Sequence, residues 1–178
     1  MRRRTALILL GIAAAALGIF LLAIDPATEA EGNPTIVDFE FAWSEEGASE
    51  ILDDWGEEGQ DAARLSLWVD FAYLLAYGAF FTLAAMATRD LAASRGWRRL
   101  ASFGAVAVPA AVAAPIFDAI EDVWLLITLD RAGGDLAPLL GGIFASAKFL
   151  TSAIAGGYIV AGLIGRLRSR SSEPRSRG

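Results

Sequence analysis

The sequence predicts an all-α fold: a membrane four-helix bundle with two short amphipathic helices in the outer loop between the first and second spans. Composition supports this, because 55% of the 178 residues are hydrophobic and the mean hydropathy is +0.47. A soluble domain of this length needs less apolar surface. Four apolar runs are also long enough to cross a bilayer, which takes roughly 20 helical residues. Clusters of arginine flank these runs.

We expect the four spans to form one domain over residues 1–168, followed by a Ser/Arg-rich, disordered cytoplasmic tail at 169–178. The predicted spans are approximately 5–24, 65–87, 100–129 and 136–167. The first run follows three arginines and can also be read as a secretory signal. Its length and its Gly/Ala packing spacings favour an anchor that is retained.

Charge predicts the orientation of the spans. Twelve of the fifteen basic residues lie in three short segments, 2–4, 89–99 and 166–177. Positive residues in short loops stay cytoplasmic, so both termini and the 88–99 loop are expected inside. Residues 25–64, with thirteen Asp or Glu and one basic residue, are then outside. The sequence therefore predicts a multi-pass protein of the cell membrane, in contact with membrane lipid.

The outer segment is expected to contain the two short helices. Thr35 followed by Asp38 resembles a capping box at the start of the first. Ser44 can cap the second, and Gly56 suits its C-terminal end. Apolar residues of this second helix recur with helical spacing: Ala48, Ile51, Leu52 and Trp55.

Two residue types are absent from the sequence, and their absence limits the kinds of catalytic and metal-binding site that the chain can form. The chain has no cysteine and no histidine, which excludes disulfides, thiolate metal sites, Ser-His-Asp or Cys-His catalysis and histidine metal ligation. The outer acids lack the spacing of a calcium loop, and no phosphate-binding or dinucleotide motif occurs. We therefore expect no cofactor and no metal site. No basic, aromatic-laced surface indicates nucleic-acid binding.

Charged residues inside the apolar runs mark the candidate site. Lys148, the only lysine, interrupts the fourth run, and Asp118 interrupts the third. An ionised group at bilayer depth costs roughly 3 kcal/mol or more, so it is rarely accidental. Asp118 lies eleven residues before Leu129 and Lys148 eleven after Ala137, which places both ~16 Å from the outer end at ~1.5 Å per residue. We therefore expect Asp118 and Lys148 to form an ion pair.

Other polar residues share helix faces with this pair, so we predict an acidic chamber in the outer half of the bundle. Its candidate residues are Asp70, Tyr73, Tyr77, Asp118, Glu121, Asp122, Lys148 and Ser152. One lysine cannot neutralise four acids. Either some carboxyl groups stay protonated, or a cation or water fills the chamber.

Three functions are compatible with this pattern. The first is binding of a small cationic or lipophilic ligand, a cation or a proton in the chamber. The second is a membrane-embedded enzyme that uses a carboxyl acid–base pair on a lipophilic substrate, although the sequence favours a role without catalysis. The third is a structural or assembly subunit in which the Asp118–Lys148 pair only fixes helix packing.

A stripe of small residues on the fourth run faces away from Lys148: Ala153, Gly157, Ala161 and Gly165. Small residues let helices approach closely in a membrane. We expect another span of the same chain to pack on this stripe, with a homodimer as the alternative.

Several short patterns resemble a family of uncharacterised bacterial four-span integral membrane proteins. They are Asp38-Phe39-Glu40, Trp55–Gly59, Asp70-Phe71, Phe117–Asp122 and Ala147-Lys148-Phe149. The resemblance covers most of the chain and implies a bacterial plasma membrane, but no activity. The layout is also similar to the emopamil-binding-protein group, which includes sterol isomerases and lipophilic-amine receptors. The third-run acids and the lysine depart from that group, so no catalytic residue is carried over from it.

Overall fold

The computed structural model describes residues 2–28 and 32–171, and all regular structure in these two segments is helical. The elements are α1 (Arg2–Ala23), a 3-10 turn η1 (Pro26–Thr28), α2 (Ile36–Glu40), α3 (Glu45–Ser94), α4 (Arg98–Leu129) and α5 (Leu136–Ser171). Four of these helices, α1, α3, α4 and α5, are long and apolar enough to cross a membrane. The all-helical prediction is therefore confirmed, with four long apolar helices as its main elements.

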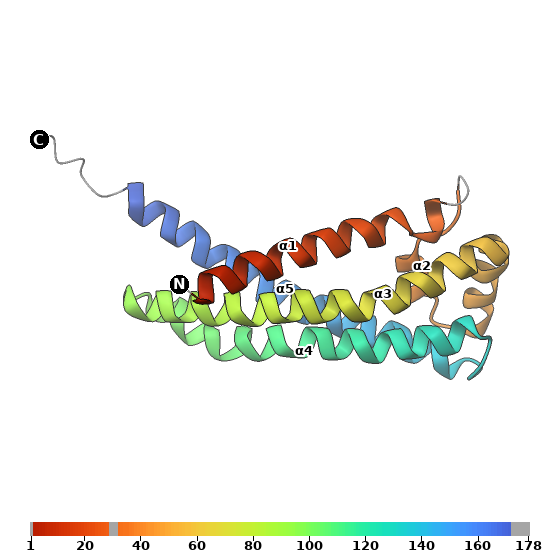
Figure 1. Cartoon of the computed structure of the whole chain (residues 1–178). Coiled ribbons are helices and arrows are strands. Elements are labelled where there is room, and N and C mark those ends of the chain that lie inside the picture. The colour runs from red at the N-terminus through yellow and green to blue at the C-terminus, as the bar shows by residue number, and fades with distance from the viewer. Residues whose placement is uncertain (1, 29–31, 172–178) are drawn as a thin grey trace, which may run out of the picture.

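The long helices run alongside one another in an up-and-down order (Figure 1). α4 packs against both α3 and α5, whereas α1 packs mainly against α3. The start of α1, the α3–α4 connection and the end of α5 lie at one end of the molecule, and α2 lies at the opposite end (Figure 1). The described parts of the three basic segments consequently share one end, which the following sections call the basic end.

The predicted second short helix corresponds to the first part of α3, which a kink at Gly56 separates from the rest of that helix. The Ser44 hydroxyl accepts a hydrogen bond of 3.1 Å from the Gly47 N–H, as expected of a cap. Gly56 then adopts φ 60° and ψ −165°, which breaks the helical geometry, but helix resumes directly after it and runs on to Ser94. A positive φ favours glycine, which has no Cβ to clash. Gly56 thus lies at the C-terminal end predicted for the short helix, and the helical segment after it is the long part of α3.

The short helix α2 begins with the capping box that the sequence suggested. The Thr35 N–H donates to Asp38 Oδ2 at 2.7 Å, and the Asp38 N–H donates to Thr35 Oγ1 at 3.2 Å. The Phe39 ring packs 5.0 Å from the Trp55 ring, and the Trp55 indole N–H donates to the Pro34 carbonyl at 2.7 Å. These contacts hold α2 against the first part of α3.

The C-terminal tail differs from its prediction in one respect. Helix α5 continues to Ser171, so the first three residues of the predicted tail, 169–171, are helical. The strong helix formers Leu and Arg at the end of this run extend the helix beyond its apolar part. The remainder of the predicted tail, residues 172–178, lies outside the described residues.

The predicted packing of the small-residue stripe is wrong for most of its length. Ala153, Gly157 and Ala161 are exposed, and a Cβ added at Gly157 would meet nothing within 4 Å. Only Gly165 is packed, against the Trp97 ring. The neighbouring helices use the other faces of α5, so no described span of the chain covers the stripe. A homodimer remains a prediction.

Candidate functional site

Lys148 lies at the centre of three carboxylates from two different helices. Its Nζ is 2.8 Å from Glu121 Oε2, 3.0 Å from Asp118 Oδ1 and 3.0 Å from Glu40 Oε1. The Lys148 side chain is 13% exposed and the Glu121 side chain is 0% exposed. The predicted contact between Asp118 and Lys148 is therefore present. Lys148 joins α5 to α4 through two acids and to α2 through the third.

The helix register explains why two acids of α4 reach the same ammonium. Asp118 and Glu121 are three residues apart, so they lie on one face of the helix. The Tyr77 hydroxyl, from α3, donates a hydrogen bond of 2.6 Å to Asp118 Oδ2, the oxygen that does not face Lys148. Asp118 is consequently held by a cation on one oxygen and by a phenol on the other.

Glu40 is the functional residue that the sequence analysis missed. It lies on α2, outside the four long helices, and its side chain is only 9% exposed. Burial raises the pKa of the Glu40 carboxyl, and the Lys148 ammonium partly offsets that effect. The only available signal was an acid between two aromatic residues, Phe39 and Phe41, in an otherwise acidic segment. That signal does not reveal which way the short helix faces.

A second group of acids adjoins the first. Carboxylate oxygens of Asp70, Asp118 and Asp122 lie within 4.8 Å of one another, a separation that suits ligands of one metal ion. Among the described residues no basic side chain forms an ion pair with Asp70 or Asp122. Asp122 is 2% exposed, and its Oδ2 has no hydrogen-bond partner there. The sequence analysis placed these three acids in one chamber but expected no metal site.

Charge does not balance in this region. Five carboxyl groups, on Glu40, Asp70, Asp118, Glu121 and Asp122, gather around a single ammonium. Carboxylates this close raise one another's proton affinity, and burial favours their neutral form. The surplus acids must therefore hold protons or a cation, and this requirement falls on the two acids without a basic partner.

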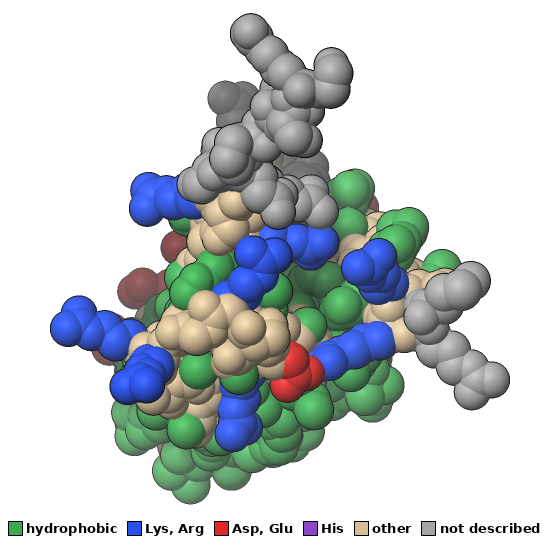
Figure 2. Space-filling model, turned by 90° about the vertical axis from the view of Figure 1, so that its left-hand side faces the viewer, with side chains coloured by type: hydrophobic (Ala, Val, Ile, Leu, Met, Phe, Trp, Pro, Cys, Tyr) green, Lys and Arg blue, Asp and Glu red, His purple; other side chains and the backbone are tan. Residues whose placement is uncertain are grey.

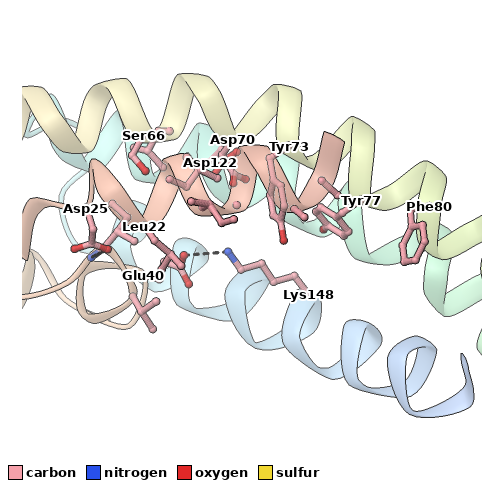
Figure 3. Close-up of a pocket in the computed structure, with 18 of the residues that line it drawn as sticks. Leu22, Asp25, Glu40, Ser66, Asp70, Tyr73, Tyr77, Phe80, Asp122 and Lys148 are labelled. Atoms are coloured by element: carbon pink, nitrogen blue, oxygen red, sulfur yellow. Dashed lines mark hydrogen bonds and ion pairs between the residues drawn. The ribbon is translucent and has the colours of Figure 1, made fainter. Parts of the chain in front are cut away.

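A cavity of about 640 Å³ opens beside these acids. Its polar end is formed by Glu40, Asp70, Asp122 and Lys148, and Figure 3 shows Lys148 reaching toward Glu40, with Asp70 beside Asp122. Tyr73 and Tyr77 continue the wall along α3, their rings 5.0 Å apart. The polar groups thus occupy one part of the cavity, with aromatic side chains leading away from them.

Helix α1 supplies the opposite, apolar wall. Its lining residues are Gly11, Ala14, Ala15, Gly18, Ile19, Leu21 and Leu22. Small residues bring α1 close to α3: a Cβ at Gly11 would lie 3.3 Å from the Phe80 ring, and one at Gly18 would lie 3.5 Å from the Tyr73 ring. The cavity exists because this wall is built largely of glycine and alanine, whose side chains are too small to fill the space beside them.

The structure brings together most, but not all, of the eight predicted site residues. Five line the cavity, namely Asp70, Tyr73, Tyr77, Asp122 and Lys148. Asp118 and Glu121 lie behind that lining, in contact with the lysine. Ser152 is half-buried and does not line the cavity. It follows Lys148 by four residues, but α5 leaves the chamber at the lysine.

Comparison with protein families, with curated proteins and with solved structures finds no match for this chain. The argument for function therefore starts from the geometry of the chamber.

Proposed function

We propose that this chain is an integral membrane protein that binds a small cation-bearing lipophilic molecule in its acidic chamber. The membrane assignment is supported by four helices of sufficient length and apolarity. Large apolar side chains on their outer faces, such as Ile8, Leu75 and Leu163, are more than half exposed. In a bilayer these side chains contact lipid and need no protein partner.

The proposed orientation places both termini in the cytoplasm and residues 25–64 outside. Figure 2 looks onto the basic end and shows Lys and Arg side chains around its rim. Positive residues in short loops remain on the cytoplasmic side. The acidic chamber then lies in the outer half of the bundle, near α2.

One observation carries the ligand assignment: Asp70 and Asp122 face the cavity without a basic partner among the described residues. The carboxylates that contact Lys148 already have a counter-charge, and they connect α2, α4 and α5. That cluster is sufficient to fix helix packing. The remaining two acids are left for a ligand, and a positively charged group supplies the missing charge.

The walls of the cavity specify the rest of the ligand. Glycine, alanine and leucine of α1 face Phe80 and Phe81 of α3 across the hollow. Burying apolar surface there gains about 25 cal/mol per Å². A molecule with an amine at one end and an apolar body at the other satisfies both parts of the cavity. We therefore narrow the ligand predicted for the chamber to an organic cation.

A second candidate is a bare proton or metal ion held by the three aspartates. It is favoured by the mutual distance of 4.8 Å or less between their carboxylate oxygens. Lys148, 3.0 Å from Asp118 Oδ1, opposes a divalent ion there through its own positive charge. The apolar walls have no part in this function, so the two candidates can be separated by experiment.

The test compares dodecylamine with dodecanol, which has the same chain and no charge. We expect dodecylamine to raise the thermal unfolding temperature of the purified protein in detergent, and dodecanol to have little effect. Asp70→Asn and Asp122→Asn should each weaken the amine effect roughly tenfold, as for a lost charge-assisted hydrogen bond. Asp54→Asn, on the exposed part of α3, is the matched control. Equal stabilisation by the alcohol, or no loss in either variant, rules out the proposal.

A further inference from the structure

A second hollow lies at the basic end of the molecule, between α1, α3 and α5. It has a volume of about 430 Å³ and is lined by three arginines, Arg4, Arg95 and Arg166, one from each of these helices or its cap. None of the described residues that line it is acidic. Figure 2 shows basic side chains around a recess at this end, with apolar side chains visible inside it.

The three arginines have no carboxylate partner among the residues that the structure describes. Arg3, by contrast, lies 2.7 Å from Asp90, and Arg64 lies 2.6 Å from Asp130. An arginine presents several N–H donors in a planar fork that matches phosphate oxygens. Three such groups from three helices, around one recess, make a site for an anion.

The inner part of the hollow is apolar and is kept open by small residues. Ala84 and Ala87 of α3 face Gly162 of α5, while Leu7 and Ile159 complete the walls. Glycine is required at position 162, because a Cβ there would overlap the Thr88 methyl group, only 2.4 Å away. The helices therefore approach closely at that point, and the groove beside it has room for a hydrocarbon chain.

We propose that this groove binds an anionic phospholipid, with its phosphate on Arg4, Arg95 and Arg166 and one acyl chain along the alanine-lined wall. Charge complementarity and the continuity of basic and apolar lining argue for lipid, because free phosphate would leave the apolar part unfilled. Basic pockets between membrane helices on the cytoplasmic side bind anionic head groups by the same physics. The inference rests on the proposed membrane location and not on the acidic chamber.

The experiment is native mass spectrometry of the full chain in detergent, with equal amounts of phosphatidylglycerol and phosphatidylethanolamine carrying the same acyl chains. We expect the protein to retain phosphatidylglycerol in preference. The R4Q/R95Q/R166Q triple variant should lose that preference by about tenfold or more, since charge-assisted hydrogen bonds to phosphate are removed. The control R98Q/R99Q/R168Q removes the same charge from the same end and should keep the preference. Equal losses in both triple variants would overturn the proposal.

A third variant tests the acyl chain without changing charge. Ala87→Leu fills the groove and should reduce phosphatidylglycerol retention severalfold while the three arginines remain. If retention is unchanged and inorganic phosphate displaces the lipid, the recess is a simple anion site and the lipid proposal fails. The two proposals can fail separately. If the protein prefers phosphatidylglycerol but is not stabilised by dodecylamine, the lipid site is supported and the function proposed for the acidic chamber is ruled out.

Discussion

Glu121 is completely buried, and among the described residues its one basic partner is Lys148, whose ammonium lies 2.8 Å away. An acid in this position depends on its cation, because an unpaired buried charge costs several kcal/mol. The same ammonium serves Asp118 and Glu40. The stability of the end of the bundle near α2 therefore depends heavily on one side chain, and this dependence leads to the first prediction.

Lys148→Met should lower the free energy of unfolding by about 3–5 kcal/mol, because it leaves three buried carboxyl groups without a cation. Adding Glu121→Gln should restore only part of the loss, since two acids remain. Thermal unfolding in detergent measures both effects. Arg64→Met, which breaks an exposed pair with Asp130, is the control and should cost less than about 1 kcal/mol. Equal costs for the two methionine variants would contradict the prediction.

Tyr77→Phe should destabilise the protein by about 1–3 kcal/mol, because it removes the hydrogen bond to Asp118 Oδ2 and leaves that oxygen unsatisfied. Tyr73→Phe is the matched control on the same face of α3, one turn away. The Tyr73 hydroxyl forms no hydrogen bond among the described residues, so its loss should have little effect on stability. The comparison of unfolding temperatures checks the prediction, which fails if both variants behave alike.

Gly78→Ala should be destabilising, by about 1–3 kcal/mol, because overpacking a tight helix contact forces the backbone apart. A Cβ at Gly78 would lie 2.6 Å from Pro115 Cγ, where α3 crosses α4. Gly157→Ala is the opposite case, since a Cβ there meets nothing within 4 Å. Alanine should stabilise that position by up to about 1 kcal/mol through its higher helix propensity. Opposite signs in denaturation measurements are therefore expected.

The Asp38 cap predicts a small dependence of stability on pH. Hydrogen bonds from the Thr35 side chain and backbone lower the pKa of Asp38 from its usual 3.8. The folded state then binds fewer protons, so this stabilisation is present above the usual pKa and is lost as pH falls through the lowered one. Its size should stay below about 1 kcal/mol, because the carboxyl is exposed. Unfolding measured at about pH 5 and about pH 2 should show a smaller acid loss for Asp38→Ala than for the unchanged protein.

The sequence predicts the parts of this structure that depend on length, hydropathy and register. Counting residues from the outer ends of two apolar runs placed Asp118 and Lys148 at one level, and the ion pair is present. Counting residues along apolar runs does not predict the helices in the polar part of the chain. Gly56 interrupts the helix as the sequence suggested, but residues 57–64, which the predicted span starting at 65 left out, are helical because glutamate is a good helix former.

Contacts between distant segments are the part that local patterns do not contain. Nothing near Glu40 specifies that α2 turns this side chain toward α5. The small-residue stripe on α5 is the opposite case. Its spacing predicts close packing, but the neighbouring helices pack on other faces of α5 and leave most of the stripe exposed. In both cases the outcome depends on how whole elements dock, which no short segment encodes.

Glu40 and Lys148 are separated by 108 positions along the chain, although their charged atoms are 3.0 Å apart. During synthesis the glutamate emerges long before the lysine is made. Helix α2 therefore has no Lys148 ammonium for Glu40 to pair with until α5, the last of the long helices, has been made. A chain that ends before α5 leaves three acids, on α2 and α4, without their cation. Synthesis of α5 therefore allows the ion pairs to α2 and to α4 to form together.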